Sequence, residues 1–337
     1  MKKKRPTIQD VAKQAGVSKA TVSKYLNNIP YVAVSTRKKI ERAIQELDFH
    51  PSTFARGLVN KSLRLIGLVI SDFEIMMKME LIKAVETEAS KYGYTVVLVS
   101  AGQNEDKLIE LLSTHYRHLD GIILANVTND GFNISRLSEV FENIVMVHRH
   151  IESVPIDYTV VDGYLGGKLA AEYLIGLGHK EIAMIAGPER ILQFEQRVQG
   201  FKDTLIEYGI EKQALFIHTD QTVEAGYRAA ENIRLEKKST SAIFASTDYL
   251  AFGVLEAARQ YGWSIPDELS VIGFDNIFFS ELARVPLTTI DGRIKDLGVS
   301  AVEILNRRIQ GKEHLEQIKL RPSLVVRDSC SRPINND

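Results

Sequence analysis

Apolar residues near the start of the chain recur three or four positions apart, the spacing that gathers them on one face of a helix. This pattern predicts three short helices, over residues 7–14, 17–27 and 34–48. Thr7, Ser18 and Ser35 are expected caps, because a hydroxyl there can accept an unpaired amide of the first turn. Gly16 lies between the first two helices and can adopt the positive φ of a tight turn. The pattern predicts a small all-α module built around a helix-turn-helix.

The second of these helices carries an unusual outer face. Val22 and Leu26 lie four apart and point inward, whereas Lys19, Ala20 and Lys24 fall on the opposite side. A polar, cationic face on the second helix of a helix-turn-helix is typical of a helix that enters the DNA major groove.

After Leu65, apolar runs of strand length alternate with amphipathic stretches. Strands are expected at 66–70, 95–99, 121–124 and 144–147, and, after the pattern restarts beyond 160–161, at 182–185, 214–217, 242–245 and 269–274. The helices between them are expected at 78–92, 104–117, 134–142, 164–177, 194–208, 224–235 and 248–261. A crossing strand at 288–290, a helix at 294–310 and a terminal strand near 318–326 complete the pattern. Such alternation predicts two doubly wound parallel-sheet lobes, with a ligand cleft between them at the strand carboxyl ends.

Between the head and the lobes, residues 51–62 form a weak helical segment. Pro51 breaks the preceding helix, and Gly57 lowers helix propensity within 53–60. A helix this short is unstable alone in water, so it becomes ordered only when something holds it. The segment is therefore a candidate switch element.

Charge is distributed unevenly along the chain. Residues 1–64 hold 14 lysines and arginines against 4 aspartates and glutamates, and the remainder holds 28 against 39. A basic head on an acidic body points to a polyanionic partner for the head, the alternative being an ordinary solvated face. One cysteine, Cys330, excludes an internal disulfide, and no apolar run reaches membrane-spanning length. We expect a cytoplasmic protein without membrane contact.

Motifs of enzyme chemistry are absent from the sequence. Gly163–Gly167 has the wrong spacing for a dinucleotide fingerprint, and neither a P-loop nor a nucleophile elbow occurs. His148 and His150 flank an arginine with no third ligand nearby in sequence, so no metal site is expected. The sequence favours a binding protein over an enzyme, although catalytic carboxylates need no motif.

Taken together, the motifs resemble the lactose-repressor (LacI/GalR) family of bacterial transcription regulators over nearly the whole chain, from Thr7 to about Val326. The matching segments are 7–23, 51–58, 176–183, 197–201, 265–275 and 286–290. The resemblance implies an N-terminal all-α helix-turn-helix domain plus an α/β periplasmic-binding-protein-like core of two doubly wound parallel-sheet lobes. It places the DNA-binding domain at 1–50, the hinge at 51–62, the core at 63–330 and a tail at 331–337. Within the core, the N-lobe comprises about 63–160 and 291–321, and the C-lobe about 161–290 and 322–330.

The same resemblance implies a homodimer on a pseudo-palindromic DNA operator, which would place the protein at the nucleoid when bound. The DNA-binding residues it implies are Thr7, Ser18, Lys19, Ala20, Thr21, Ser23, Lys24, Asn27, Ala55 and Leu58. Lys19, Ala20 and Lys24 match base readers; the alternative is that both lysines contact phosphate alone. Leu58 matches a leucine that wedges between central base pairs, the alternative being packing against the partner's hinge.

Effector contacts are implied at the strand ends. They are Ser71, Asp72, Phe73, Arg149, Arg197, Gln221, Thr247, Asp248 and Asp275. Carboxylate and guanidinium groups suit a polyhydroxylated or anionic small molecule, and the family implies a sugar or sugar derivative rather than a cofactor. The alternatives are that Asp275 caps a helix and Arg197 bridges the lobes. The expected function is repression of a carbohydrate-utilisation operon, relieved by the sugar. A purine corepressor, a coregulated global regulator and a sugar-binding protein without DNA function are the competing hypotheses.

Overall fold

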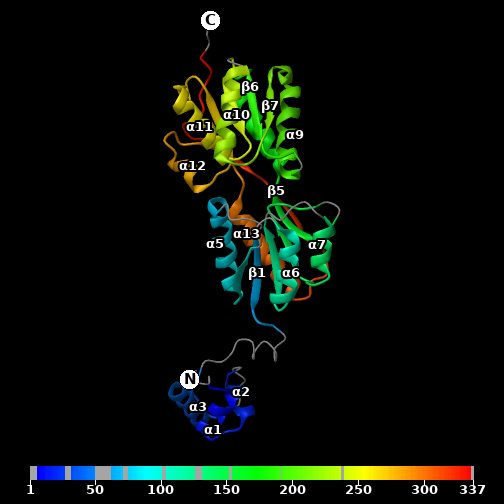
Figure 1. Ribbon diagram of the computed structural model, residues 1–337, viewed down its shortest axis with the longest axis vertical. Helices are drawn as coiled ribbons and strands as arrows, with labels where there is room; N and C mark the ends of the chain where they lie inside the picture. The colour runs from blue at the N-terminus through cyan, green and yellow to red at the C-terminus, as the bar shows by residue number, and fades with distance from the viewer. Residues whose placement is uncertain are drawn as a thin grey trace. The chain divides into compact units, whose positions relative to one another are not determined.

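A computed structural model describes residues 6–26, 32–49, 62–70, 75–100, 104–125, 131–151, 154–189, 191–236 and 239–334 (Figure 1). The chain divides into two compact units. The first, here called the head, comprises residues 1–65 and 118–120, and the second, the core, comprises 66–117 and 121–337. Residues 51–61 of the expected hinge lie outside the described residues.

The head contains the three predicted helices. They are α1 (Ile8–Ala15), α2 (Lys19–Leu26) and α3 (Val34–Leu47). Val11, Val22 and Ile40, one from each helix, are fully buried at their common centre. The expected cap at Ser35 is wrong: α3 begins at Val34, and its N-cap Ala33 has no side chain able to accept a hydrogen bond.

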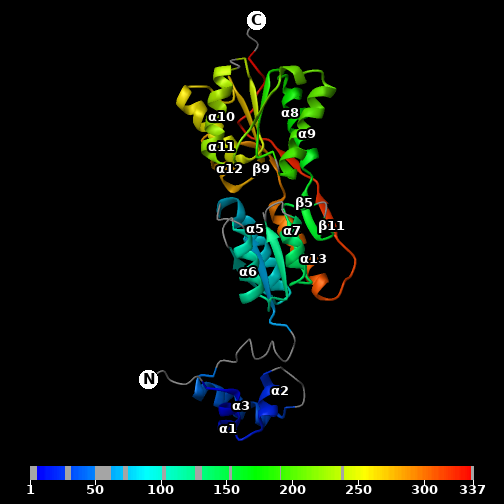
Figure 2. The same cartoon turned by 45° about the vertical axis from the view of Figure 1, so that its right-hand side comes forward.

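One six-stranded sheet forms the N-lobe of the core, in the order β11-β5-β4-β3-β1-β2. Its strands are β1 (Leu65–Ile70), β2 (Thr95–Val99), β3 (Gly121–Ala125), β4 (Ile144–Val147), β5 (Asp157–Val161) and β11 (Gln317–Leu320). Its helices are α5 (Ile75–Lys91), α6 (Glu105–His115), α7 (Gly131–Ser138) and α13 (Ile294–Ile309). Alternate residues of β1, β3 and β4 pack with α5 and α13 in one apolar cluster, while α6 and α7 contact each other (Figure 2).

A second six-stranded sheet forms the C-lobe, in the order β12-β10-β9-β8-β6-β7. Its strands are β6 (Ile182–Ala186), β7 (Leu215–His218), β8 (Ala242–Ala245), β9 (Ser270–Asp275), β10 (Thr288–Asp291) and β12 (Ser323–Val325). Helices α8 (Gly163–Leu177) and α9 (Leu192–Glu207) cover one face, and α10 (Val223–Glu236) and α11 (Asp248–Tyr261) cover the other. Two short helices, η1 (Glu211–Gln213) and α12 (Phe278–Leu282), complete the lobe.

Three connections join the two lobes in the described chain. They run from β5 to α8, from β10 to α13 and from β11 to β12. The strand expected near 318–326 is therefore two strands in different sheets, with β12 pairing antiparallel to β10. Because β5, β10 and β11 all leave their sheets at their carboxyl ends, those ends of both sheets lie at the crossovers, where a ligand of parallel sheets is expected.

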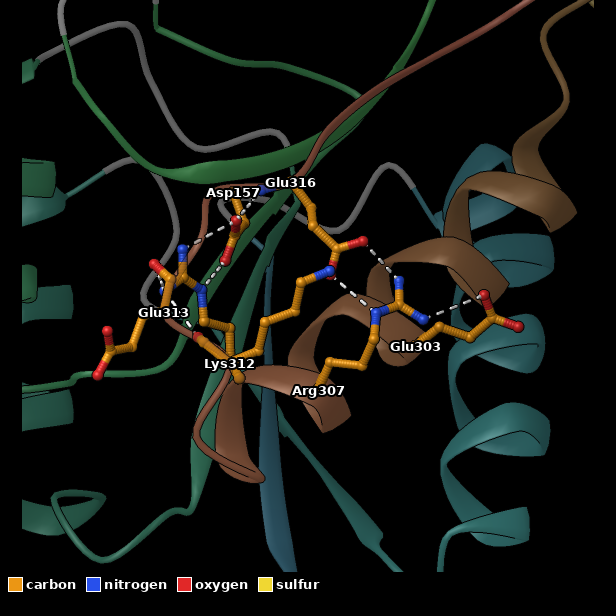
Figure 3. Close-up of polar contacts among 7 residues, drawn as sticks. Asp157, Glu303, Arg307, Lys312, Glu313 and Glu316 are labelled. Atoms are coloured by element: carbon orange, nitrogen blue, oxygen red, sulfur yellow. Dashed lines mark hydrogen bonds and ion pairs between the residues drawn. The ribbon is translucent and has the colours of Figure 1, made fainter.

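A network of charged side chains holds β11 and the end of α13 against the start of β5 (Figure 3). Asp157 is buried and accepts from the backbone N–H of Glu316 at 2.6 Å; it also pairs with Arg308, whose Nη2 lies 3.2 Å from Oδ1. Arg307 binds the carboxylate of Glu316 with two nitrogens, at 2.8 and 2.9 Å. The network fixes the strand that leads into the third crossover.

One predicted helix has clearly different bounds, and one short helix was not predicted. The helix expected at 134–142 spans Gly131–Ser138, because the buried Phe141 belongs to the turn before β4 and only imitates a continued helical stripe. Helix α12 has five residues, too few to show any periodicity. In the part of the chain that the structure describes, no helix has the length and apolar character needed to cross a bilayer.

Candidate DNA-binding face and effector site

The outer face of α2 is cationic and open to solvent. Lys19, Ala20 and Lys24 are exposed, whereas Val22 is buried. Among the described residues, nothing forms an ion pair with Lys19 or Lys24, so both ammonium groups are available to DNA. Thr21 and Ser23 are half-buried at the edges of this face.

Two of the expected DNA contacts also act as helix caps. The Thr7 hydroxyl accepts from the backbone N–H of Asp10, and the Asp10 carboxylate accepts from the Thr7 N–H at 2.8 Å, which forms a capping box. Ser18 Oγ accepts from the backbone N–H of Thr21 at 3.1 Å, as predicted. Gly16 has φ 68°, which makes the sharp turn between α1 and α2 possible. These caps begin α1 and α2 at fixed residues and so orient the cationic face.

Side chains of α3 tie the three helices together. Tyr25 of α2 donates its hydroxyl to Glu41 at 3.0 Å, and Gln14 of α1 donates to Glu46 at 2.8 Å. Both acceptors lie on α3, which therefore holds α1 and α2 in one arrangement.

The candidate effector site is built on the close approach of α8 and α9 in the C-lobe. A Cβ on Gly167 would lie 2.0 Å from the carbonyl oxygen of Arg197, and a Cβ on Gly200 would lie 1.9 Å from that of Tyr164. Only glycine permits this backbone contact. It draws α9 onto the lobe so that Arg197, one of the largest fully buried side chains, points to the end of β9.

Arg197 meets Asp275 at the carboxyl end of β9. Its Nη2 lies 3.3 Å from Asp275 Oδ1, and both side chains are 1% exposed. Nη1 donates to the carbonyl oxygen of Ser246, and the guanidinium carbon lies 3.5 Å from the centroid of the Phe274 ring. Burial raises the pKa of Asp275 to about 7, against the lowering effect of Arg197. Asp275 has φ 110°, a positive value that Asp and Asn tolerate better than other side chains.

Several polar atoms of this site have no partner among the described residues. They are Arg197 Nε, Asp275 Oδ2 and both polar atoms of the Gln193 amide. Gln193 is 3% exposed and lies one helical turn before Arg197 on α9. Sequence reasoning missed it, although its i, i+4 spacing from Arg197 was a usable signal. Buried polar groups are nearly always paired in native proteins, so these atoms are candidate contacts for a polar ligand.

Asp248 and Thr247 differ from this cluster, because their side chains are hydrogen-bonded to other residues of the C-lobe. The Asp248 carboxylate accepts from the Ile277 N–H at 2.9 Å, and from the hydroxyls of Ser280 and Thr289 at 2.6 Å each. Thr247 caps α11 by accepting from the Leu250 N–H at 3.2 Å. Both residues are buried, and every hydrogen bond observed for them is internal. Their predicted contact with an effector stays a prediction.

The remaining expected effector contacts that the structure describes lie just after the carboxyl ends of strands. Arg149 follows β4 and Gln221 follows β7, and both are half-buried. Ser71, Asp72 and Phe73 lie outside the described residues, as do Asn27, Ala55 and Leu58 from the DNA-binding set. A cavity of about 290 Å³ also lies at the crossovers, and it brings residues of both lobes together. Its lining includes Glu80, Asp275, Asn276, Arg293, Lys295 and Arg327.

A helix-turn-helix head with a free cationic helix, joined to a two-lobe core with a polar ligand site, defines the class of ligand-responsive DNA-binding regulators. Two family models match the chain: "Bacterial regulatory proteins, lacI family" over residues 7–52, and "Periplasmic binding protein-like domain" over residues 171–330.

Curated relatives cover almost the whole chain. The transcriptional regulator DegA of Bacillus subtilis is 35% identical over 98% of this chain and 99% of its own. Catabolite control protein A of Priestia megaterium is 34% identical over 89% and 92%, and the repressor PurR of Histophilus somni is 34% identical over 96% and 98%. The chain belongs to the LacI family of bacterial transcriptional regulators, and its relatives are regulators rather than enzymes.

Solved structures agree with this assignment. The lac repressor dimer bound to operator and the anti-inducer ONPF has a TM-score of 0.88 and 26% identity, covering 97% of this chain and all of that one. A LacI-family regulator from Enterococcus faecium with bound ribose has a TM-score of 0.72 and 28% identity, covering 80% and 99%.

Proposed function

We propose that the protein represses a carbohydrate-utilisation operon. It binds a pseudo-palindromic operator as a homodimer, and a sugar or sugar derivative held between the lobes releases it. The proposed effector binding is supported above all by the buried side chains of Arg197, Asp275 and Gln193. Their unpaired atoms comprise a guanidinium donor, a carboxylate acceptor and an amide that does both. Adjacent hydroxyls of a sugar ring, each both donor and acceptor, complement such a set.

The proposed DNA binding is supported by the exposed residues of the head. Lys19, Ala20 and Lys24 stand together on the exposed face of α2, where the lysines can donate to guanine O6 and N7 and the Ala20 methyl can contact thymine. Thr7, Ser18, Thr21 and Ser23 are proposed to bind the sugar-phosphate backbone. The lac repressor neighbour is a dimer on its operator, which supports the same arrangement for this chain.

The proposed mechanism is a population shift. The effector binds beside the three crossovers and favours one arrangement of the lobes. That arrangement sets whether the hinges at 51–62 of the two subunits can pair and fold on the operator. Effector and operator must then change each other's affinity by the same factor.

Two measurements test the proposal on the full-length protein. First, double-stranded fragments enriched from a random library are titrated at several salt concentrations; specific binding that falls steeply with salt supports an operator-binding head. Second, sugars, sugar acids, phosphosugars and nucleobases are screened by thermal shift with and without the fragment. A sugar that raises the melting temperature and weakens DNA binding supports induction. Absence of specific DNA binding would contradict the whole proposal.

A second candidate is a corepressor-dependent regulator. PurR and catabolite control protein A are among the relatives, at 34% identity each. The side-chain amide of Gln221 offers a nucleobase hydrogen bonds but no ring face for stacking. A nucleobase that tightens DNA binding in the same screen would favour this candidate over the sugar.

A further inference from the structure

The hinge at 51–62 ends at Ser62, and a single carboxylate holds this end. Asp120 Oδ2 accepts from the Ser62 hydroxyl at 2.9 Å and from the backbone N–H of Leu65 at 3.1 Å. The Asp120 N–H donates in return to the carbonyl oxygen of Leu65 at 2.8 Å. Asp120 is half-buried, and the two residues that donate to it lie 58 and 55 positions earlier in the chain. These hydrogen bonds among Ser62, Leu65 and Asp120 are here called the hinge latch.

The chain turns sharply inside the hinge latch. Arg64 has φ 55°, a left-handed conformation that residues other than glycine seldom adopt. The Arg64 backbone N–H donates to Ser62 Oγ at 3.2 Å, so the Ser62 hydroxyl accepts from Arg64 while it donates to Asp120. A residue with a side chain stays at a positive φ only where its surroundings hold it there. The hydrogen bonds of Ser62 and Asp120 therefore fix the direction in which the chain leaves the hinge.

Asp120 stands directly before a strand of the N-lobe. The next residue, Gly121, begins β3, and Leu65 begins β1. These two strands pair in parallel from Ile66 and Gly121 onward, inside the N-lobe sheet. Residues 118–120 nevertheless group with residues 1–65 in one compact unit, although they lie between α6 and β3 in sequence. The latch therefore joins the last hinge residue to the start of two neighbouring strands.

An ordinary strand cap explains only part of these contacts. A side chain that accepts the N–H of Leu65 satisfies the start of β1 without any help from Ser62. The bond between the Ser62 and Asp120 side chains adds nothing to the sheet, but it restricts the hinge. A carboxylate acceptor strengthens both bonds, because charge-assisted hydrogen bonds are roughly twice as strong as neutral ones.

We propose that Asp120 is a positioning residue for operator binding, an inference that rests on the proposed DNA-binding function. Its carboxylate fixes Ser62, so the hinge starts from a set place at the beginning of β1 and β3. Each residue that is already ordered before binding spares the complex the loss of its conformational entropy. Asp120 thus favours the operator complex without touching DNA or effector.

The test uses the full-length protein and the double-stranded fragment enriched from the random library. Asp120→Ala removes both side-chain hydrogen bonds of the latch, and Ser62→Ala removes one of them. We expect affinity for the fragment to fall about tenfold in Asp120→Ala and about threefold in Ser62→Ala, because the freed residues must be ordered again on binding. Amide exchange of residues 62–65 should become faster in the same order. Affinity for an unrelated duplex of equal length should not change, since it depends on the cationic groups of the head.

A matched control and the melting temperature separate positioning from folding. Asp106→Ala removes an aspartate of α6 whose side chain is 86% exposed, and it should bind the fragment like the wild type. Loss of affinity for both duplexes together with a lower melting temperature would show a structural role alone and overturn the proposal. Wild-type affinity for the fragment in Asp120→Ala would also overturn it. A wild-type protein without specific binding would contradict the proposed function itself, and the role of Asp120 with it.

Discussion

Arg197 and Asp275 are 78 residues apart in sequence and form a buried ion pair, with Arg197 Nη2 3.3 Å from Asp275 Oδ1. Each partner keeps one unpaired polar atom, Nε on the arginine and Oδ2 on the aspartate. The pair thus holds itself in place while offering a donor and an acceptor to a third group. This is the arrangement expected of a ligand site rather than of a purely structural ion pair.

Removing one member of this pair should abolish the effector response. Arg197→Ala leaves Asp275 buried without its partner and should lower the free energy of unfolding by about 3–5 kcal/mol. Asp275→Asn is the gentler change, because asparagine tolerates the positive φ at this position. We expect Asp275→Asn to fold and to lose the thermal shift produced by the effector. Arg228→Ala, at an exposed position, should retain the thermal shift. An unchanged thermal shift in Asp275→Asn would contradict the site assignment.

Two buried carboxyl groups should give the core an unusual pH dependence. Burial raises the pKa of Asp248 to about 6 and that of Asp275 to about 7, above the ordinary value near 3.8 of the unfolded chain. Between these values the folded core binds protons that the unfolded chain does not. The free energy of unfolding of the effector-free protein should therefore fall as the pH rises from about 5 to 7. Chemical denaturation across this range measures the slope, and Asp275→Asn should make the slope shallower, whereas Asp220→Asn, at an exposed position, should not.

Lys24→Ala distinguishes base reading from phosphate contact. If Lys24 reads a base, its loss should cost about 1–3 kcal/mol on the preferred operator and relax selectivity at one position. If Lys24 contacts phosphate alone, its loss would weaken binding to all DNA sequences alike and would reduce the slope of log affinity against log salt concentration by about 1. We expect the first outcome in anisotropy titrations against single-base operator variants. Lys202→Ala, which removes a lysine from α9, serves as the charge control.

Leu58→Ala tests the hinge, which lies outside the described residues. Insertion of a leucine between base pairs offsets the few kcal/mol of unstacking through the added contact that a bent duplex allows. The variant should bind the operator more weakly while the core keeps its melting temperature and effector response. Unchanged operator affinity would show that Leu58 is not a wedge.

Thr7→Ala should destabilise the head without touching the core. The variant loses the capping box with Asp10, which should cost about 1 kcal/mol of helix stability. Amide hydrogen exchange of α1 measures the effect directly. Gln9→Ala, an exposed position on the same helix, should leave the exchange rates unchanged.

Periodicity predicted most of the fold because it reports on local geometry. The strands at 95–99, 144–147 and 242–245 and the helix at 248–261 have the bounds that were predicted. Each depends on side chains that alternate every two or every 3.6 residues, a property of neighbouring positions alone. Resemblance to a family then supplied Arg197 and Asp275 as candidates, although no local pattern connects them.

The features that the sequence did not predict depend on contacts between residues distant in sequence. Asp248 has the same carboxylate as Asp275, but its bonds to Ile277, Ser280 and Thr289 form only when α11, α12 and β10 come together. Gln193 became part of the site because α9 is drawn down by glycines on both helices. The segment near 318–326 reads as one strand, yet it is shared between two sheets. Residue type sets what a side chain can bind, and packing across the fold sets which partner it meets.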